Sequence, residues 1–512
     1  MGRTNNIRAV AIIAGLAAAL PGGANADDWK LEAGISAKET YTDNVALSST
    51  NRQSDFITDL SPYITASKKG ARFQADFRYA MQNLFYADQS SRNRINHQLA
   101  GRAKAELWEN ELFLDANASI SQQLTSLLGP VGDTATAASN TTDVYTLSVS
   151  PYWQHRFGST ANLLARYTHG EVSSSGSSFA NSSTDSINTT LSSGTAFNNW
   201  FWNLAYSDQQ TNYSNRPDVK LSTVSGAVGY SITAKLRVNG TVGYDKNNYL
   251  YTGTTKPQGR FWSAGFSWAP TNRTTLSASR GERYFGKTYS LAFDHRTRRT
   301  TWHAAYAQDV TTTASQFTFP YGVSTFDYLY NRADWEALFP DPSQRATMVT
   351  LAILMNGWPL VLTDQSTVLT SQVYLNKRFD ASVGYRTAKT VTTLSLLDVQ
   401  RESQESGNVS SALYPTDIFA ATNSTKQRGA QLMWLWTMNP RLSASIGLNL
   451  TRNEFPQLGR TDKLSVLSVG LTRTFNNQLT GSVNLRHQQR DSNVAGGEYR
   501  ENALIGAVNY KF

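Results

Sequence analysis

The sequence of 512 residues contains no cysteine, so its fold and chemistry do not depend on a disulfide or a thiolate. It also lacks any apolar run of about eighteen residues, the length that a membrane-spanning helix requires, and its mean hydropathy is −0.41. These absences exclude a helical membrane protein. They do not exclude a membrane protein built of strands, because only alternate residues of such strands face lipid.

A concentrated charge of one sign is also missing. The formal net charge is +9, but the lysines and arginines are scattered along the chain and form no basic run. A nucleic-acid partner is therefore not expected.

Residues 1–26 have the features of a cleaved signal peptide. Arg3 and Arg8 form the positive end, residues 9–20 are apolar, and Ala24-Asn25-Ala26 supplies a small-residue cleavage site. The remaining chain, 27–512, is then exported and is expected to form one β-barrel domain. Its first strand starts within a few residues of the cleavage site, so we expect no amino-terminal plug domain.

The exported chain repeats segments of about a dozen residues in which apolar and polar side chains alternate, as in strands with one greasy face. In the last segment, Leu504, Val508, Tyr510 and Phe512 share one face. A strand that ends the chain finds its neighbour far back in the sequence, and pairing with the first strand would close the sheet. The terminal Phe512 also resembles the insertion signal of Gram-negative outer-membrane barrels.

The connections between segments alternate between short and long. Tight turns rich in Gly, Asn and Pro, such as Lys69-Gly70 and Asn439-Pro440, alternate with longer polar loops such as 124–142 and 404–426. This alternation is typical of an antiparallel up-and-down barrel with short periplasmic turns and long extracellular loops. We predict an all-β transmembrane barrel of about 22 strands, within a range of 18 to 24, in the bacterial outer membrane.

A soluble all-β protein is the alternative. Aromatic residues near the tight turns argue against it, because they are placed like the girdle at a membrane interface. These are Trp108, Trp153, Trp200, Trp202, Trp268, Trp434, Trp436 and Phe475. Outer-membrane lipid is therefore the expected surrounding.

The longest connection, 313–369, is expected to be an extracellular loop that contains a short helix near 342–356. Asp341 and Pro342 are typical of a helix start, and Gly357 supplies a stop. Met348, Leu351 and Met355 recur at helical spacing and form a possible gate. Whether this helix packs on other loops or narrows the pore mouth stays open.

Catalytic and metal-binding patterns are absent from the sequence. The six histidines are isolated, and there is no His-Glu-x-x-His pair or Gly-x-Ser-x-Gly elbow. Linear spacing leaves open a Ser–His pair assembled across neighbouring strands. We expect no enzyme activity, no cofactor and no metal.

The polar strand faces carry an excess of positive charge, with ten basic and six acidic residues on the segments that can be phased. The predicted pore-lining basic residues are Arg78, Arg102, Lys104, Arg166, Arg237, Arg296 and Arg486. A basic wall favours anions, whereas opposite charges that pair across strands stiffen the wall. Both roles are expected.

Short motifs resemble a known family, the outer-membrane barrels associated with PEP-CTERM/exosortase systems, which are related to the β-barrel porin type-2 group. The matching segments are Glu39–Asn44 after the first strand, Arg283–Gly286 with Thr288 and Tyr289, His295-Arg296 with Arg298-Arg299, the 341–357 helix, and Lys377-Arg378. The resemblance implies an outer-membrane location beside machinery that makes exopolysaccharide. It supplies no catalytic or binding residues.

From these observations we expect a porin-like channel associated with exopolysaccharide export and PEP-CTERM protein sorting. Its candidate partners are acidic polysaccharide and periplasmic export components. The alternative is a structural or adhesive barrel whose loops bind surface glycans or proteins.

Overall fold

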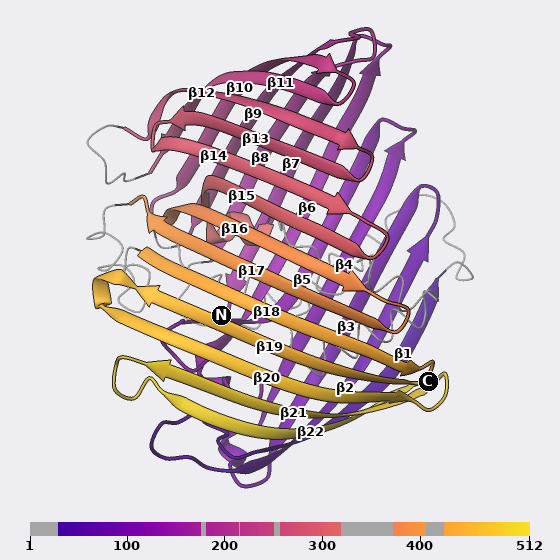
Figure 1. The fold of residues 1–512 in the computed structure, drawn as a ribbon, viewed down its shortest axis with the longest axis vertical. Helices are drawn as coiled ribbons and strands as arrows, with labels where there is room; N and C mark the ends of the chain where they lie inside the picture. The colour runs from indigo at the N-terminus through magenta and orange to yellow at the C-terminus, as the bar shows by residue number, and fades with distance from the viewer. Residues whose placement is uncertain (1–28, 176–180, 215, 250–255, 319–371, 406–423) are drawn as a thin grey trace.

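The computed structural model describes residues 29–175, 181–214, 216–249, 256–318, 372–405 and 424–512. The expected signal peptide therefore lies outside the described residues. In this part of the chain, 22 antiparallel strands form one closed sheet, so the predicted barrel and strand number are confirmed (Figure 1). No helix of the described residues is long and apolar enough to span a membrane.

The strands follow the chain in order around the sheet. The first half comprises β1 (Lys30–Thr42), β2 (Asp55–Lys69), β3 (Phe73–Tyr86), β4 (Arg94–Trp108), β5 (Leu112–Leu124), β6 (Thr141–Phe157), β7 (Ala161–Ser174), β8 (Ser182–Ser193), β9 (Trp200–Tyr213), β10 (Val219–Thr233) and β11 (Leu236–Asn248). The second half comprises β12 (Gln258–Thr271), β13 (Thr274–Arg283), β14 (Gly286–Arg296), β15 (Thr300–Thr312), β16 (Val373–Arg386), β17 (Thr390–Ser403), β18 (Ser424–Asn439), β19 (Leu442–Phe455), β20 (Arg460–Thr474), β21 (Leu479–Ser492) and β22 (Tyr499–Lys511). The described helical segments are α2 (Thr313–Thr318) and the 3₁₀ turns η2 (Ser90–Arg92), η3 (Ala138–Asn140) and η4 (Pro456–Leu458).

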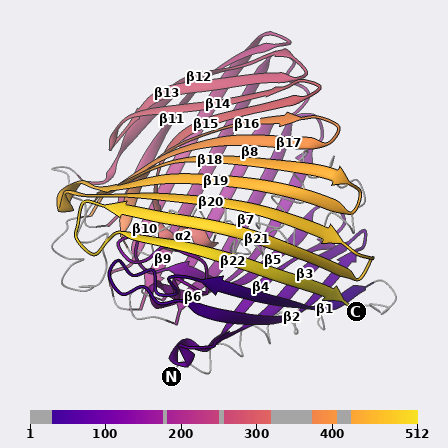
Figure 2. The ribbon, with the colours of Figure 1, turned by 60° about the horizontal axis from the view of Figure 1, so that its bottom comes forward.

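The barrel closes between its first and last strands, which Figure 2 brings forward. β1 pairs with β22 from Gly34 opposite Lys511 to Thr42 opposite Ala503. The amide of Phe512 also donates to the carbonyl of Ala33 at 2.9 Å. Because this pairing leaves no free edge, every backbone group along the seam can be satisfied without water.

The outward face of the barrel is apolar. Residues directly opposite each other on paired strands share a face, and the register places the large exposed hydrophobic side chains on the outside. Examples are Leu31, Trp108, Trp200, Val242 and Leu485, which are between 57% and 70% exposed. Apolar side chains that contact no other part of the protein are stable in an apolar medium, so this face fits a lipid environment.

Short turns lie at one end of the barrel and most long connections at the other, on the left of Figure 1. Asn110 and Gly158 have positive φ angles of 58° and 55° in two of the short turns, a conformation that Asn and Gly tolerate. The predicted alternation does not hold everywhere, since β19 and β20 are joined at the long-loop end by residues 456–459 alone. β13 and β14 are joined at the long-loop end by Tyr284 and Phe285 alone.

Candidate pore and the strap across it

The inward face of the barrel is polar, and its basic residues outnumber its acidic ones. The inward basic residues of the strands are Lys30, Lys38, Lys69, Arg78, Arg94, Arg102, Lys104, Arg156, Arg166, Arg237, Arg283, Arg296, Arg378, Arg386, Arg401, Arg460, Arg486, Arg490 and Lys511. The inward acidic residues are Glu32, Asp55, Asp59, Asp76, Glu106, Asp115, Asp245, Asp294, Asp309, Asp380, Asp462 and Glu501. The two halves of the barrel use these charges differently.

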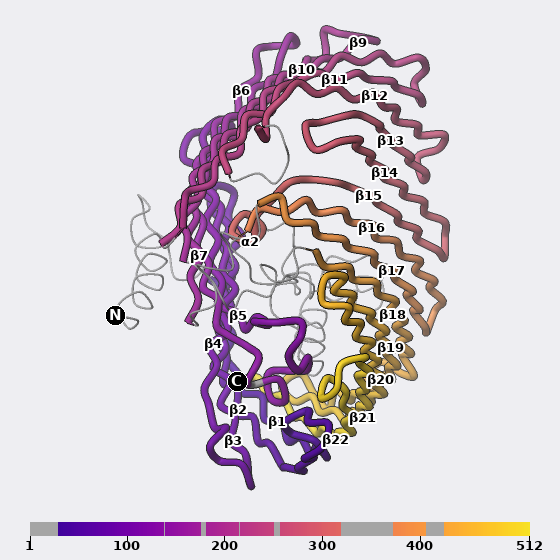
Figure 3. Tube along the Cα trace, turned by 90° about the vertical axis from the view of Figure 1, so that its left-hand side faces the viewer, coloured from indigo at the N-terminus to yellow at the C-terminus, as the bar shows by residue number. Residues whose placement is uncertain are grey.

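Residues 125–140, which connect β5 to β6, lie inside the barrel, and we call them the strap. Figure 3 looks along the barrel from the long-loop end and shows this segment within the ring, beside β1 and β22. The strap contacts side chains of β3, β20, β21 and β22, far from its own strands in sequence. It therefore crosses part of the lumen.

An ion-pair network holds the middle of the strap. The Arg486 guanidinium lies 2.7 Å from Asp133 of the strap and 2.7 Å from Glu501 of β22, and all three side chains are at most 10% exposed. Thr42 donates to Glu501 at 3.0 Å. Burial alone would raise the pKa of the Asp133 carboxyl, but the charges of Arg486 and Lys38 hold it well below its ordinary value. Asp133 is therefore ionised and bound in place.

A second network holds the start of the strap. The carboxylate of Asp462 pairs with Arg490 at 2.5 Å and with Arg460 at 3.0 Å. The same guanidinium groups donate to strap carbonyls, Arg490 to Leu127 at 2.9 Å and Arg460 to Leu128 at 3.0 Å. Because a carbonyl in a buried loop needs a donor, these two arginines satisfy backbone groups that the crossing would otherwise leave unpaired.

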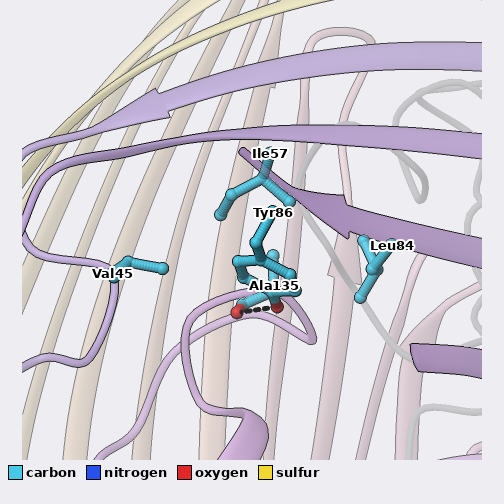
Figure 4. Close-up of a cluster of buried hydrophobic side chains, with 5 residues drawn as sticks. All are labelled: Val45, Ile57, Leu84, Tyr86 and Ala135. Atoms are coloured by element: carbon cyan, nitrogen blue, oxygen red, sulfur yellow. Dashed lines mark hydrogen bonds between the residues drawn. The ribbon is translucent and has the colours of Figure 1, made fainter. Parts of the chain in front are cut away.

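Apolar contacts hold the far side of the strap. Ala135 packs with Val45, Ile57, Leu84 and Tyr86, all of which are buried (Figure 4). The hydroxyl of Tyr86 donates to the carbonyl of Ala135 at 2.6 Å. The strap thus combines ion pairs, backbone hydrogen bonds and a small apolar cluster.

The helix α2 also lies inside the barrel. It follows β15 directly and lies inside the ring in Figure 3. It contacts β6, β7 and β8 and bonds to Gln209 of β9. Phe317 packs with Val144 and Val172, and Gln209 donates to the hydroxyl of Ser315. The sequence did not predict this helix, because its apolar residues are too few to produce a helical period.

The inward face of β12 to β15 is different, and we call it the open wall. Its residues at the centre of the sheet are small, namely Ser263, Gly265, Ser267, Ser277, Ser279 and Gly281. On β14, Ala292, Asp294 and Arg296 are exposed although they face inward, and on β15 the same holds for Thr301 and His303. Solvent therefore reaches this part of the lumen.

Comparison with known proteins adds two findings. The family model described as "Putative beta-barrel porin 2" matches residues 420–512, which comprise β18 to β22. A search of curated proteins gave no match. The matched segment contains β22, the strand that closes the barrel by pairing with β1.

The chain is a porin-like β-barrel of the outer membrane.

Solved structures with similar folds include an iron transporter and siderophore receptors. The FrpB iron transporter of Neisseria meningitidis (F5-1 variant) is 9% identical at a TM-score of 0.49, covering 94% of this chain and 82% of that one. The siderophore receptor PiuA of Acinetobacter baumannii is 10% identical at a TM-score of 0.48, covering 96% and 82%. PirA of Pseudomonas aeruginosa is 8% identical at a TM-score of 0.44, covering 94% and 80%. At this level of similarity, no ligand is transferred to this chain.

In this porin-like barrel the short-turn end is periplasmic and the long-loop end extracellular. The strap and α2 are thus attached at the extracellular end, where β5 and β15 finish. Arg237, Arg296 and Arg386 lie beside short turns, at the periplasmic end of the open wall and of neighbouring strands. We call these three residues the mouth arginines.

The predicted pore-lining residues all face inward, but they fall into three groups. Arg78 and Arg486 are buried. Arg78 is 8% exposed, and Arg486 belongs to the ion-pair network of the strap. Arg102 and Arg166 pair with carboxylates, Asp76 at 3.5 Å and Asp115 at 2.8 Å. The contribution of these four residues to ion conduction stays a prediction.

The remaining three predicted residues are exposed. Lys104 lies over the stacked rings of Phe113 and Tyr152, 5.2 and 5.9 Å from their centroids. Arg237 and Arg296 carry no ion pair to any residue of the described chain. These two are free to act on a solute.

The predicted gate residues Met348, Leu351 and Met355 lie outside the described residues, as does the helix near 342–356. Among the described residues, the strap and α2 lie inside the barrel. α2 is the described start of the 313–369 connection, whereas the sequence analysis treated 124–142, which contains the strap, as an ordinary polar loop. No group of three metal ligands occurs in the described part of the chain. The histidines bond to Tyr, Asp, Glu, Thr or Asn side chains there.

The sequence analysis did not predict that side chains of β21 bind the strap. Arg486, Gln488 and Arg490 alternate along the inward face of β21, and all three bond to the strap. Three long polar side chains in a row near the extracellular end were the available signal. The partners Asp133 and Val131 sit in a loop whose length and polarity resembled those of ordinary surface loops.

Proposed function

We propose that the protein is a passive channel that favours anions. The observation that carries this proposal is the uneven pairing of charges along the open side of the lumen. Two acidic residues there have a basic partner, since Asp294 bonds to His303 at 2.8 Å and Asp380 to Arg378 at 3.2 Å. Asp309 of β15 is exposed without an ion pair to a described residue, but it lies toward the extracellular end, away from the mouth arginines. The mouth arginines have no such partner among the described residues.

Unpaired cations at one end of a pore lower the electrostatic barrier for anions and raise it for cations. Asp245, an inward carboxylate of β11, is buried and held by Arg283 at 2.9 Å. The field at the periplasmic mouth is therefore positive. The strap narrows the other half of the lumen, so the favoured path runs beside the open wall.

The solute we propose is an acidic polysaccharide, in association with exopolysaccharide export and PEP-CTERM protein sorting. Support comes from the basic wall and from the resemblance of the short motifs quoted above. An export channel for a polyanion requires a polar, positively charged lumen, and this barrel supplies one.

The test is the reversal potential of the purified protein in a planar bilayer under a KCl gradient. We expect chloride to permeate better than potassium. The variant R237Q/R296Q/R386Q should lower the chloride-to-potassium permeability ratio by about threefold or more, because the three unpaired charges at the mouth are lost.

The matched control is K246Q/R260Q/K287Q, which removes the same charge from the outward face at the extracellular end. It should leave the permeability ratio unchanged. Absence of a channel, cation selectivity in the parent protein, or an equal effect of both variants would each contradict the proposed function.

A further inference from the structure

Five successive short turns of the barrel share one design. They join β10 to β11, β12 to β13, β14 to β15, β16 to β17 and β18 to β19, and their sequences are Thr233-Ala234-Lys235, Thr271-Asn272-Arg273, Thr297-Arg298-Arg299, Thr387-Ala388-Lys389 and Asn439-Pro440-Arg441. Each begins with Thr or Asn and places a basic residue two positions later. None of the five contains an acidic residue.

The hydrogen bonds in these turns repeat as well. The first side chain of each turn accepts from the amide of the basic residue, at 3.1 Å for Thr233 and Lys235 and at 2.9 Å for Asn439 and Arg441. The other three turns show the same bond at 3.2 Å. This is the turn that Ser, Thr and Asn side chains stabilise, so the basic residue holds a fixed place at each apex.

The repeated basic residues form an arc on the periplasmic rim, which we call the crown. It consists of Lys235, Arg273, Arg299, Lys389 and Arg441, all exposed and without an ion pair to any described residue. Strands lie about 4.8 Å apart, so consecutive turns repeat at roughly 10 Å and the crown extends over roughly 40 Å.

The rest of the periplasmic rim lacks this pattern. The β4–β5 turn carries Glu109 and Glu111, and Glu109 pairs with Arg72 of the β2–β3 turn at 3.5 Å. The turns at 158–160, 194–199 and 475–478 contain no charged residue. The turn with Thr or Asn followed by a basic residue two positions later is therefore confined to the arc from β10 to β19, which includes the open wall and the mouth arginines. Elsewhere on this rim the basic residues Lys69, Arg72, Arg156 and Arg473 are scattered and share no such turn.

We propose that the crown is the docking site of an acidic polymer that enters the channel from the periplasm. This inference rests on the proposed function and adds the side of entry and the chemistry of the substrate. A single compact anion needs donors that converge on it, whereas the crown's cations are spread along an arc. A flexible chain with regularly repeated carboxylates can meet several of them in turn.

The composition of the turns disfavours a folded protein partner. Protein interfaces are built around apolar and aromatic side chains, and the five apices contain only Thr, Ala, Asn, Pro, Lys and Arg. Attraction here is electrostatic. It concentrates a polyanion beside the mouth arginines, which then face the same polymer at the pore entrance.

Binding of fluorescently labelled oligogalacturonate to the full-length barrel in lipid nanodiscs tests the inference. The crown variant K235Q/R273Q/R299Q/K389Q/R441Q should weaken binding by about tenfold or more at low salt, since exposed cations near a surface each contribute modestly and are screened by salt. The control K246Q/R260Q/R280Q/K287Q/K426Q removes the same charge from the extracellular outward face and should bind as the parent does.

Three outcomes would overturn the inference. They are equal binding by parent and crown variant, an equal loss in crown variant and control, and binding of uncharged dextran as tight as that of oligogalacturonate. Loss of bound phosphatidylglycerol in the crown variant with oligogalacturonate binding retained would assign the crown to lipid headgroups instead.

Failure of the inference differs from failure of the proposed function. The crown variant keeps Arg237, Arg296 and Arg386, so it should stay anion-selective in bilayers and lose less chloride preference than R237Q/R296Q/R386Q does. A barrel that is anion-selective but indifferent to the crown charges refutes the docking site alone. A barrel that is not anion-selective refutes the proposed function, whatever the crown binds.

Discussion

The two halves of this barrel treat inward-facing charge in opposite ways. Around the strap, the inward charges of β20 to β22 are buried or nearly so and are bound to one another or to the strap, with Glu501 fully buried and Arg490 3% exposed. Along β12 to β15, Asp294 and Arg296 face solvent. An inward charged residue therefore stabilises the fold where a loop covers it. Where no loop covers it, the residue is accessible to solutes.

The physical reason is the cost of burying charge. A guanidinium covered by protein loses its water and must be paired, so Arg486 contacts two carboxylates. An exposed guanidinium such as Arg296 keeps its water and needs no partner. The number of charges along a strand does not distinguish a buried guanidinium from an exposed one. Whether the strap covers the residue does distinguish them.

The largest expected effect concerns the paired half. Replacing Arg486 with Ala leaves Asp133 and Glu501 buried without their cation, which should cost about 3–5 kcal/mol in the free energy of unfolding. Arg296→Ala in the open half should change it by less than about 0.5 kcal/mol. Urea unfolding of the detergent-solubilised barrel, followed by tryptophan fluorescence, measures both. Equal effects would remove the distinction between the halves.

Removal of the strap should come next. Replacing residues 127–138 with a two-residue Gly-Ser link keeps β5 and β6 joined while it clears one side of the lumen. We expect the single-channel conductance to rise severalfold, because the conducting cross-section grows. A conductance within about 20% of the parent value would mean that the strap lies outside the ion path, and the comparison would then concern stability alone.

A smaller effect is expected at the apolar end of the strap. Tyr86→Phe keeps the packing with Ala135 but removes the hydroxyl that donates to its carbonyl, which should cost about 1 kcal/mol. Tyr289→Phe on the outward face of β14, where no hydrogen bond to the hydroxyl is described, is the matched control and should be neutral. Urea midpoints of the two variants give the difference directly.

The smallest effect is expected from mild acid. The pKa of Asp133 is lowered in the folded protein, so its pairing stabilises the strap above the ordinary value of 3.8 and is lost only as the pH falls through the lower folded value. Between pH 7 and pH 4, the strap should therefore stay in place, and current recordings should show no new conductance level. Asp133→Asn, which removes the charge, should show such a level at pH 7.

The sequence alone determined the barrel. Alternating faces, the short and long connections and the aromatic-ended last strand are all local, and they fixed the fold, the strand number and the outer-membrane location. The inward direction of Arg237 and Arg296 followed from the same period of two, because a strand with one face in lipid has its other face inside. The Thr-x-Lys and Thr-x-Arg turns of the crown are also visible in the sequence. Their position side by side on one rim is not.

Tertiary structure decided which inward charges are free. Arg486 and Arg296 have the same sequence signature, and they differ only because the strap returns to β21 and leaves β14 uncovered. Asp133 meets Arg486 across 353 positions of the chain. A period of two specifies the face of a residue but carries no information about a loop that folds back from the far end of another strand.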